Sequence, residues 1–506
     1  MSETTLTRRE FLKASAGVAA AAAASSPGCA WLLPVPRPAP VGTFVNDVHS
    51  QLNRTRVRRL VRPSSMEALQ QAVRRAAAEE CAVSVSGARH AMGGQQFGTD
   101  TVLLDLRGMD RVLTFDAGAG EVEVEAGAGW PALIRSLIDV QRGQPRQWSI
   151  LQKQSGADLL TIGGALACNA HSRALRMKPI ISDVQAFTLV DADGNLHRVS
   201  RREAPELFRL AIGGYGLFGV IGSVRLRLGP RRKLERIVEV LDVEELMPAF
   251  ERRIDDGFLY GDFQYAIDRS SEEFLRTGVF SCYRPLPDDA KMPPRMVELS
   301  AEEWRELISL AHAEPGRAFA RYRAHYLATS GQRYWSDLHQ LGTYVDRYHE
   351  EVDRRLQAAA PSSEIITEVY VPRETLSPFL RDVRADFRAH EVPLIYGTIR
   401  LIERDDESFL AWAKASYACV IFNLHTVHTP SGIERSAQDF RRLIDLAIRY
   451  DGSYYLTYHR FATREQVVRC YPQFPAWLRL KRRYDPEERF QSDWYRHYQA
   501  MFADII

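Results

Sequence analysis

The sequence predicts an α+β fold with two domains, and three features of the chain predict it. A helix, a strand and a Gly-rich loop follow one another within residues 64–98. After about residue 230, the blocks 232–268 and 363–403 each predict strand, helix, strand, which indicates a weak internal repeat. A further strand at 418–429 precedes a helix at 436–450. These later segments predict a large, mostly antiparallel sheet covered by helices.

Composition excludes several classes of protein. The chain has 506 residues, of which 26% are charged and 45% hydrophobic, and its formal net charge is +2. This balance is ordinary for a soluble globular protein and gives no reason to expect nucleic acid as a partner. The six cysteines are scattered and no CxxC occurs, so we expect neither a disulfide framework nor a metal site. Beyond the N-terminus we expect no integral membrane span.

Residues 1–30 resemble a twin-arginine (Tat) export signal. TRREFLK at 7–13 combines twin arginines with a Phe-Leu pair and a lysine, and a short Ala-rich run follows. We expect export through Tat to a periplasmic or other extracytoplasmic location, with Ala24 as a candidate end of the signal, since Cys29 stands in a poor lipobox. The alternative is a chance Arg-Arg pair before an Ala-rich helix. Residues 31–50, which are Pro-rich, predict an extended linker.

The segment 51–230 predicts a nucleotide-binding domain of an unusual kind. No GxGxxG opens a helix after a strand, and no P-loop motif occurs. The Gly-rich loop at 87–98 can still cradle a pyrophosphate, because glycine lets backbone N–H groups approach an anion closely. The expected elements are a helix at 64–79, strands at 81–87 and 101–106, a hairpin of 112–116 with 121–127, a helix at 129–138, and a hairpin across 184–200.

Three segments in this order resemble the PCMH-type FAD-binding family, also called the vanillyl-alcohol oxidase superfamily. The loop GARHA at 87–91 resembles the family's G-x-G-H-S, with departures at Arg89 and Ala91. The stretches 159–173 and 211–228 resemble its two later glycine-rich segments. Near the end, Lys481, Asp485, Pro486 and Phe490 match its closing K-x-x-x-D-P-x-x-x-F. The resemblance implies an FAD domain at 51–230, an antiparallel cap domain for substrate at 231–465, and a return to the FAD domain at 466–506.

The resemblance also implies which residues bind FAD. It implies a covalent bond from His90 to the flavin, whereas the alternative is a histidine that only hydrogen-bonds phosphate or backbone. Some relatives use a second, cysteine link, but Cys168 lies beyond that position, so we expect a single link. The predicted FAD-binding residues are Ser86, Gly87, Ala88, Arg89, His90, Ala91, Gly94, Gln95, Thr161, Gly163, Gly164, Leu166, Ala167, Cys168, Asn169, His171, Ser172, Val220 and Ile221.

Candidates for the chemistry come from alditol-oxidising relatives. Their first cap strand carries x-E-I-R, of which Arg400 is retained while Thr398 replaces the glutamate, so a polyol substrate does not carry over. On the next strand, His425 shares a face with Asn423, and His428 points to the other face. His459 is the first match for a basic residue near the C-terminus, and Tyr458 is one register away. A histidine is a suitable base near neutral pH.

These residues predict an FAD-dependent oxidoreductase that oxidises a CH–OH group of a small molecule. Hydride would pass to the flavin, and oxygen or another carrier would accept the electrons. Two alternatives stay open. One is an exported flavin-binding or ligand-binding protein without turnover, which the departures from the family pattern favour. The other is a reductase of the same fold that uses NADPH and non-covalent FAD, which export disfavours.

Overall fold

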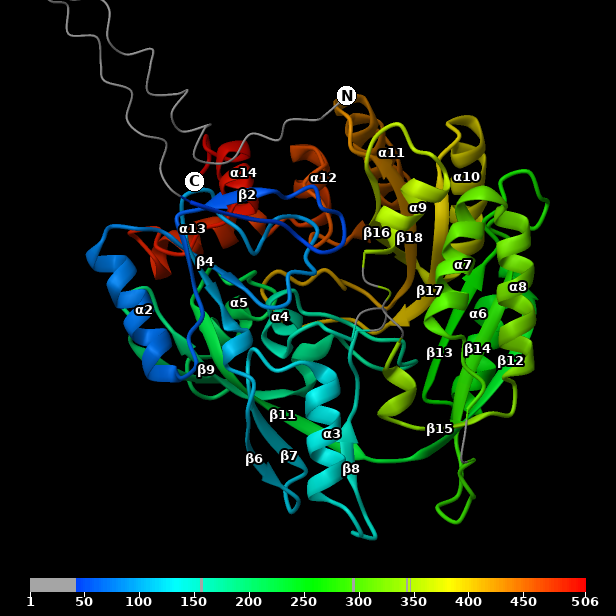
Figure 1. Ribbon diagram of the computed structural model, residues 1–506, viewed down its shortest axis with the longest axis horizontal. Coiled ribbons are helices and arrows are strands. Elements are labelled where there is room, and N and C mark those ends of the chain that lie inside the picture. The colour runs from blue at the N-terminus through cyan, green and yellow to red at the C-terminus, as the bar shows by residue number, and fades with distance from the viewer. Residues whose placement is uncertain (1–41, 155–157, 294–295, 343–344, 346) are drawn as a thin grey trace, which may run out of the picture. The chain divides into compact units, whose positions relative to one another are not determined.

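The structure is a computed structural model that describes residues 42–154, 158–293, 296–342, 345 and 347–506. The predicted signal, with TRREFLK at 7–13, Ala24 and Cys29, lies outside the described residues. Residues 42–506 form one unit. Figure 1 shows its two parts, an N-terminal half in blue and cyan and a cap sheet in green and orange. Within the described residues, no helix combines the length and the apolar character needed to cross a bilayer.

The first half begins with a small parallel sheet, ordered β3-β5-β4. The predicted helix at 64–79 is α2, which Ser65 caps by accepting a hydrogen bond from Ala68 N at 3.2 Å. Its apolar face, Leu69, Val73 and Ala76, is buried, as the spacing predicts. The bounds are β1 Thr43–Val45, β2 Thr55–Val57, β3 Arg59–Val61, α2 Met66–Ala78, β4 Val83–Ser86, β5 Val102–Asp105 and η1 Leu106–Gly108.

A second, antiparallel sheet completes the first half, in the order β10-β9-β11-β7-β6, and β8 also pairs with β11. The predicted hairpins are both present, as β6 with β7 and β9 with β10. The bounds are β6 Val112–Asp116, β7 Glu121–Glu125, α3 Trp130–Val140, β8 Trp148–Ile150, α4 Ile162–Ala167, η2 Ile180–Asp183, β9 Val184–Val190, β10 Leu196–Ser200, α5 Pro205–Ala211 and β11 Val220–Pro230.

The cap is a mixed-order sheet of eight antiparallel strands, β15-β12-β14-β13-β17-β18-β16-β19, with helices packed against it. Both predicted strand-helix-strand blocks are present. The segment 270–362 combines helices with strands β14 and β15, which both pair with β12. The bounds are β12 Lys233–Asp242, α6 Val243–Asp255, β13 Tyr260–Tyr265, β14 Thr277–Pro285, α7 Ala301–Ala313, α8 Pro315–Ala328, β15 Arg333–Trp335, η3 Leu338–Gln340, α9 Tyr348–Arg355, β16 Ser362–Pro372, η4 Arg373–Thr375, α10 Leu376–Ala389, β17 Leu394–Ile402, β18 Tyr417–Val427, α11 Pro430–Arg449 and β19 Ser453–Tyr454.

Strands β17, β18 and β16 place side chains in rows across the sheet. Tyr396, Asn423 and Ile366 form one row. Thr398, Ile421 and Glu368 form the next row. Because side chains alternate along a strand, these two rows share one face.

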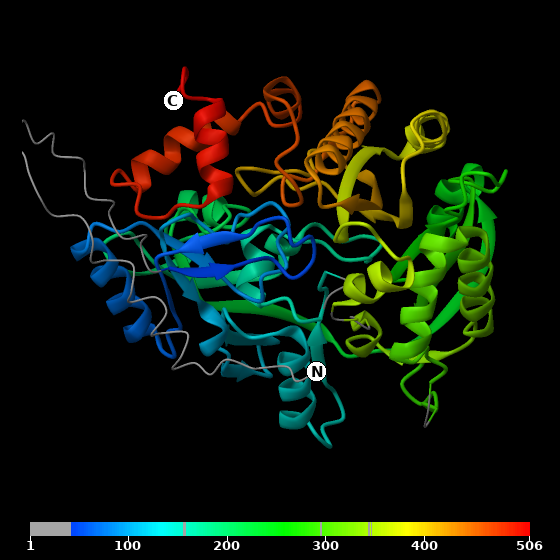
Figure 2. The same cartoon turned by 45° about the horizontal axis from the view of Figure 1, so that its top comes forward.

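The C-terminal segment returns to the first half, where its helices lie beside the N-terminal strands (Figure 2). The backbone N–H of Val83 donates to the carbonyl of Arg489 at 2.6 Å, and Gln491 N donates back to Val83 O at 2.8 Å. This pairing continues the small sheet directly before the 87–98 loop. The helices are α12 Arg464–Cys470, α13 Phe474–Tyr484 and α14 Asp493–Met501.

Candidate functional site

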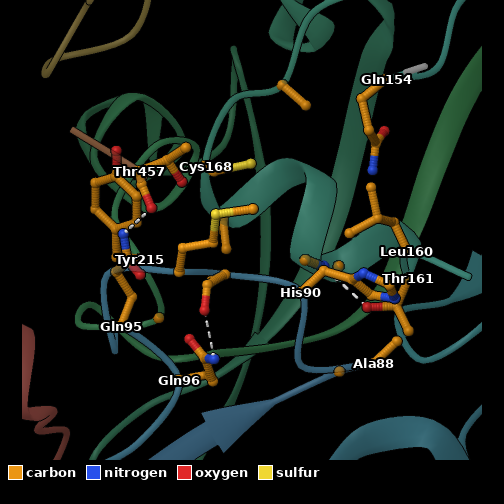
Figure 3. Close-up of a pocket in the computed structure, with 18 of the residues that line it drawn as sticks. Ala88, His90, Gln95, Gln96, Gln154, Leu160, Thr161, Cys168, Tyr215 and Thr457 are labelled. Carbon is orange, nitrogen blue, oxygen red and sulfur yellow. Dashed lines mark hydrogen bonds between the residues drawn. The ribbon is translucent and has the colours of Figure 1, made fainter. Parts of the chain in front are cut away.

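A cavity of about 300 Å³ lies where the first half of the chain meets the cap sheet. Its walls come from the loop after β4, the segment 160–171, the segment 211–221 and the facing cap strands. Figure 3 shows how Gln95, from the loop, donates a hydrogen bond to the carbonyl of Thr457, at 2.6 Å. This hydrogen bond joins the loop to the segment that follows β19, the last strand of the cap sheet.

The loop at 87–91 has a backbone that explains one departure from the family pattern. Arg89 adopts φ 65°, the left-handed region in which glycine is favoured. In this conformation the guanidinium of Arg89 lies 3.7 Å from the buried carboxylate of Asp105. Gly87 permits close packing on Thr161, because a Cβ at residue 87 would lie 2.0 Å from the Thr161 hydroxyl oxygen.

His90 follows in the cavity wall, 8% exposed, with its ring 5.0 Å from that of His49. Burial, together with the neighbouring His49, lowers the pKa of His90 to about 3. The imidazole is therefore neutral near pH 7. A neutral imidazole offers a nucleophilic ring nitrogen, which a protonated one does not.

Helix α4 presents the glycine pair of the second family segment. Thr161 caps this helix, and its hydroxyl accepts a hydrogen bond from Gly164 N at 3.3 Å. Gly163 packs tightly on strand β7's end, since a Cβ there would lie 2.8 Å from the Cβ of Ala126. Its N–H donates to the Ala126 carbonyl at 2.8 Å. Gly163 thus allows α4 to pack closely against the end of β7, and it also lines the cavity.

A buried carboxylate, Glu368 on β16, forms the cap side of the cavity. Its Oε1 lies 2.7 Å from His171 Nε2, and its Oε2 accepts a hydrogen bond from the Tyr458 hydroxyl at 3.2 Å. Tyr370 also donates to it. Burial opposes ionisation of Glu368, but the charge and hydrogen bond of His171, with Tyr370 and Arg400, outweigh it and lower its pKa. The cavity therefore contains an ionised proton acceptor.

Most of the predicted FAD-binding residues line this one cavity, although they come from three separate segments. Those that line it are Ser86, Gly87, Ala88, Arg89, His90, Ala91, Gln95, Thr161, Gly163, Gly164, Ala167, Cys168, His171, Val220 and Ile221. Burial raises the pKa of Cys168 to about 11, which keeps it a poorly nucleophilic thiol.

Four predicted FAD-binding residues do not line the cavity and make contacts within the protein. Leu166 is buried in the core. Asn169 donates its side-chain amide to Asp405 at 2.8 Å, and the Ser172 hydroxyl donates to Gln152. Gly94 has φ +79° and supplies a turn that other residues enter only with strain.

The candidates for catalysis divide in the same way. Tyr458 and Arg400 line the cavity, whereas His459 does not. Neighbouring side chains of this segment point in different directions, so the ring of His459 stacks instead on Phe461 at 3.6 Å. His425 also lies outside this cavity and faces Glu364 at 3.5 Å. The one-residue register alternative, Tyr458, therefore replaces His459 as the candidate.

Sequence reasoning missed several lining residues. Glu368 is the most important, and its signal was two glutamates at i and i+4, Glu364 and Glu368, within an apolar strand pattern. Tyr215 and Phe218 fall within the third family segment but were not singled out. The other missed residues include His49, Met92, Gln96, Gln154, Leu160, Gly216, Gly219, Ile366, Tyr396, Ile421, Tyr455 and Thr457.

Comparison with known proteins supports an FAD-binding protein. Residues 57–200 match the family model described as an FAD binding domain. The chain is 25% identical over 445 residues to L-gulono-1,4-lactone dehydrogenase of Mycobacterium tuberculosis (strain ATCC 25618 / H37Rv), which covers 86% of this chain and 95% of the relative. Residues 57–200 thus form an FAD-binding domain, and the chain is similar over most of its length to a flavoprotein oxidoreductase of the PCMH type.

Two further comparisons agree with this family. Cytokinin dehydrogenase 2 of Oryza sativa subsp. japonica is 33% identical to the flavoprotein over 155 residues, 29% of this chain and 26% of that one. The solved structure of a solvent-stable cholesterol oxidase superposes with a TM-score of 0.67 at 15% identity, over 90% of this chain and 97% of that one. At that identity the likeness shows the fold, and the predicted α+β class is confirmed.

FAD fits the cavity chemically. Six buried polar atoms of the cavity-lining side chains have no hydrogen-bond partner among the described residues: Ser86 Oγ, Arg89 Nε, Gln95 Oε1, Gln96 Oε1, Gln154 Oε1 and Arg400 Nε. Buried polar groups are costly unless they are hydrogen-bonded, so such a set favours a polar ligand rich in donors and acceptors. The phosphates, ribityl chain and ring edges of FAD supply both.

Proposed function

We propose that this flavoprotein oxidises a CH–OH group of a small molecule to a carbonyl. The observation that carries the proposal is the ionised Glu368, hydrogen-bonded to Tyr458 beside Arg400, in the wall of the same cavity as the FAD-binding loop. FAD, when bound, supplies the acceptor for the hydride that leaves the substrate carbon. A lactone dehydrogenase and a cholesterol oxidase among the similar proteins are consistent with such a reaction.

Residues of the chain accept the proton that the substrate hydroxyl releases. Oxidation of an alcohol releases the hydroxyl proton along with the hydride. The Tyr458 hydroxyl, whose pKa burial raises far above its ordinary value, stays protonated and donates to Glu368. It can therefore accept a hydrogen bond from the substrate hydroxyl and pass a proton on to the Glu368 carboxylate. The Arg400 guanidinium supplies a positive charge near the Tyr458 hydroxyl and the Glu368 carboxylate.

The test is reduction of the flavin under anaerobic conditions. With an oxidisable alcohol, Glu368→Gln should lower the rate of flavin bleaching by about a hundredfold, the usual scale for losing a general base. Glu403→Gln is the matched control, because Glu403 pairs with Arg373 outside the cavity. Flavin content and melting temperature are measured for each variant. If alcohols reduce the flavin and Glu368→Gln bleaches at the wild-type rate, the proposed role of Glu368 is wrong. If no alcohol in a panel reduces the wild-type flavin, the proposed function is wrong.

Covalent attachment of FAD through His90 is the second part of what we propose. An N–C bond replaces one C–H bond of the flavin 8α-methyl group, and the two electrons and two protons released go to an acceptor such as dioxygen. The neutral, buried imidazole supports this attachment. Wild-type protein precipitated with acid should stay yellow, and His90→Ala should release its flavin into the supernatant. Release of flavin from the wild-type protein would exclude the bond.

Export through Tat is the third part, and TRREFLK at 7–13 supports it. Tat carries folded proteins, which suits an enzyme that takes up its cofactor before export. Replacement of Arg8 and Arg9 by lysine should retain the protein in the cytoplasm with FAD bound, as fractionation would show. A double variant that is exported normally would contradict the Tat assignment.

A further inference from the structure

A second cavity, of about 250 Å³, continues the first one into the cap. The two cavities share wall residues, among them Met92, Ile366, Tyr396 and Ile421. Beyond this shared wall, side chains of α7 and α8 make the second cavity apolar. They include Trp304, Leu307, Ile308, Ala318, Phe319 and Tyr322. We call this second cavity the apolar chamber.

One end of the apolar chamber is polar. Glu364 and Asn423 line it there, and His312 and His425 lie 3.0 and 3.5 Å from Glu364 Oε1. Burial opposes ionisation of Glu364, but hydrogen bonds from these two histidines and from the Tyr348 side chain outweigh it and lower its pKa. Glu364 Oε2 and Asn423 Oδ1 are buried and have no hydrogen-bond partner among the described residues. Both atoms are acceptors, so this end suits a hydrogen-bond donor.

Strand β16 sets the distance between the two polar ends. Glu364, Ile366 and Glu368 alternate with residues of the opposite face, so all three project toward the cavities. Four residues of strand span about 14 Å. The proposed proton acceptor Glu368 and the polar end at Glu364 are therefore separated by about 14 Å of mainly apolar wall.

We propose that the apolar chamber is the substrate subsite, and that it takes an elongated apolar alcohol with a second hydrogen-bond donor, such as a hydroxyl, at its far end. This inference rests on the proposed oxidation of an alcohol. A sugar or polyol fits poorly, because each hydroxyl placed against Leu307 or Phe319 loses its hydrogen bonds to water without replacement. An apolar body gains free energy from the same burial.

The first experiment compares paired ligands on the purified flavoprotein. Three probes are titrated while the flavin absorbance is followed: a long-chain α,ω-diol, the mono-alcohol of equal length, and a linear polyol. The diol should bind about tenfold more tightly than the mono-alcohol, the scale of a hydrogen bond to a charged or buried group. The polyol should bind most weakly. A polyol that binds more tightly than the diol would overturn the inference.

Variants at the polar end sharpen the comparison. Asn423→Leu and Glu364→Gln should each reduce the diol's advantage, while binding of the mono-alcohol stays within about twofold of the wild type. The mono-alcohol thus reports correct folding in the same sample. An unchanged diol advantage in both variants would contradict the assigned end. So would a transition-metal ion bound stoichiometrically at His312, Glu364 and His425 whose removal abolishes the advantage.

Filling the chamber tests its location. Ala318 faces the chamber from α8 and is 3% exposed, whereas Ala320 is exposed on the same helix. Ala318→Trp should weaken both long alcohols by tenfold or more and leave a short alcohol unaffected, and Ala320→Trp should match the wild type. Equal binding of long alcohols by both variants would refute the chamber. If the diol binds as described but no alcohol reduces the flavin, the chamber stands and the proposed oxidation fails.

Discussion

A substitution at His459 can distinguish a structural role of this histidine from a catalytic one. Its ring stacks on Phe461, and neither ring nitrogen has a hydrogen-bond partner among the described residues. Burial, with the charges of Arg460 and His497, lowers the pKa of His459 to about 3. In the unfolded chain the pKa returns to about 6.5. Below that pH the unfolded state binds the proton more readily, so stability falls as pH falls from about 6.5 towards 3.

The magnitude follows from the two pKa values. At about pH 5 the unfolded histidine is mostly protonated and the folded one is not, which costs roughly 2 kcal/mol of unfolding free energy. At pH 7 this cost vanishes. His459→Phe keeps the stacked ring and removes the titrating group. The variant should therefore match the wild type at pH 7, within about 1 kcal/mol, and exceed it by about 2 kcal/mol at pH 5.

Urea unfolding at both pH values measures this difference, and anaerobic flavin reduction at pH 7 accompanies it. Flavin content and the rate of reduction should be unchanged in His459→Phe, because the residue lies outside the cavity. A loss of a hundredfold in the rate with full flavin content would refute the structural role and return His459 to catalysis. An equal pH dependence of wild type and variant would refute the low pKa.

Three further predictions concern single side chains. Asp485→Ala should destabilise the protein by about 3–5 kcal/mol in urea unfolding, because it leaves the buried Lys481 ammonium unpaired and two backbone N–H groups unbonded; a loss below about 1 kcal/mol would contradict this. Arg89→Gly should keep its flavin, whereas Arg89→Val should destabilise by at least about 1 kcal/mol, because a β-branched residue resists positive φ. Tyr458→Phe should slow flavin reduction about tenfold or more at unchanged flavin content; wild-type rates would remove Tyr458 from the proton path.

Sequence patterns indicated the loop side of the cavity because close packing there requires glycine. A Cβ at Gly87 or Gly164 would press on the Thr161 hydroxyl oxygen, and one at Gly163 would press on Ala126, so only glycine fits at these positions. Such requirements leave glycine at fixed spacing, which is visible in one sequence. The strand and helix order of the cap was visible for a similar reason, since alternation and helical periodicity follow from burial of one face.

The cap side of the site was harder because it depends on strand register. Glu368 meets Ile421 and Thr398 only through strand pairing between residues that lie about 50 and about 20 positions apart in the chain, and a shift of one residue turns a different set of side chains inward. At the segment 455–459, which has no regular strand beyond Tyr454, not even alternation applies. Sequence matching could therefore narrow the choice to Tyr458 or His459, but the choice itself required the packing of Phe461 and Phe440 around the histidine ring. The same packing makes His459 replaceable by an apolar ring, whereas Tyr458 is fixed to its carboxylate partner.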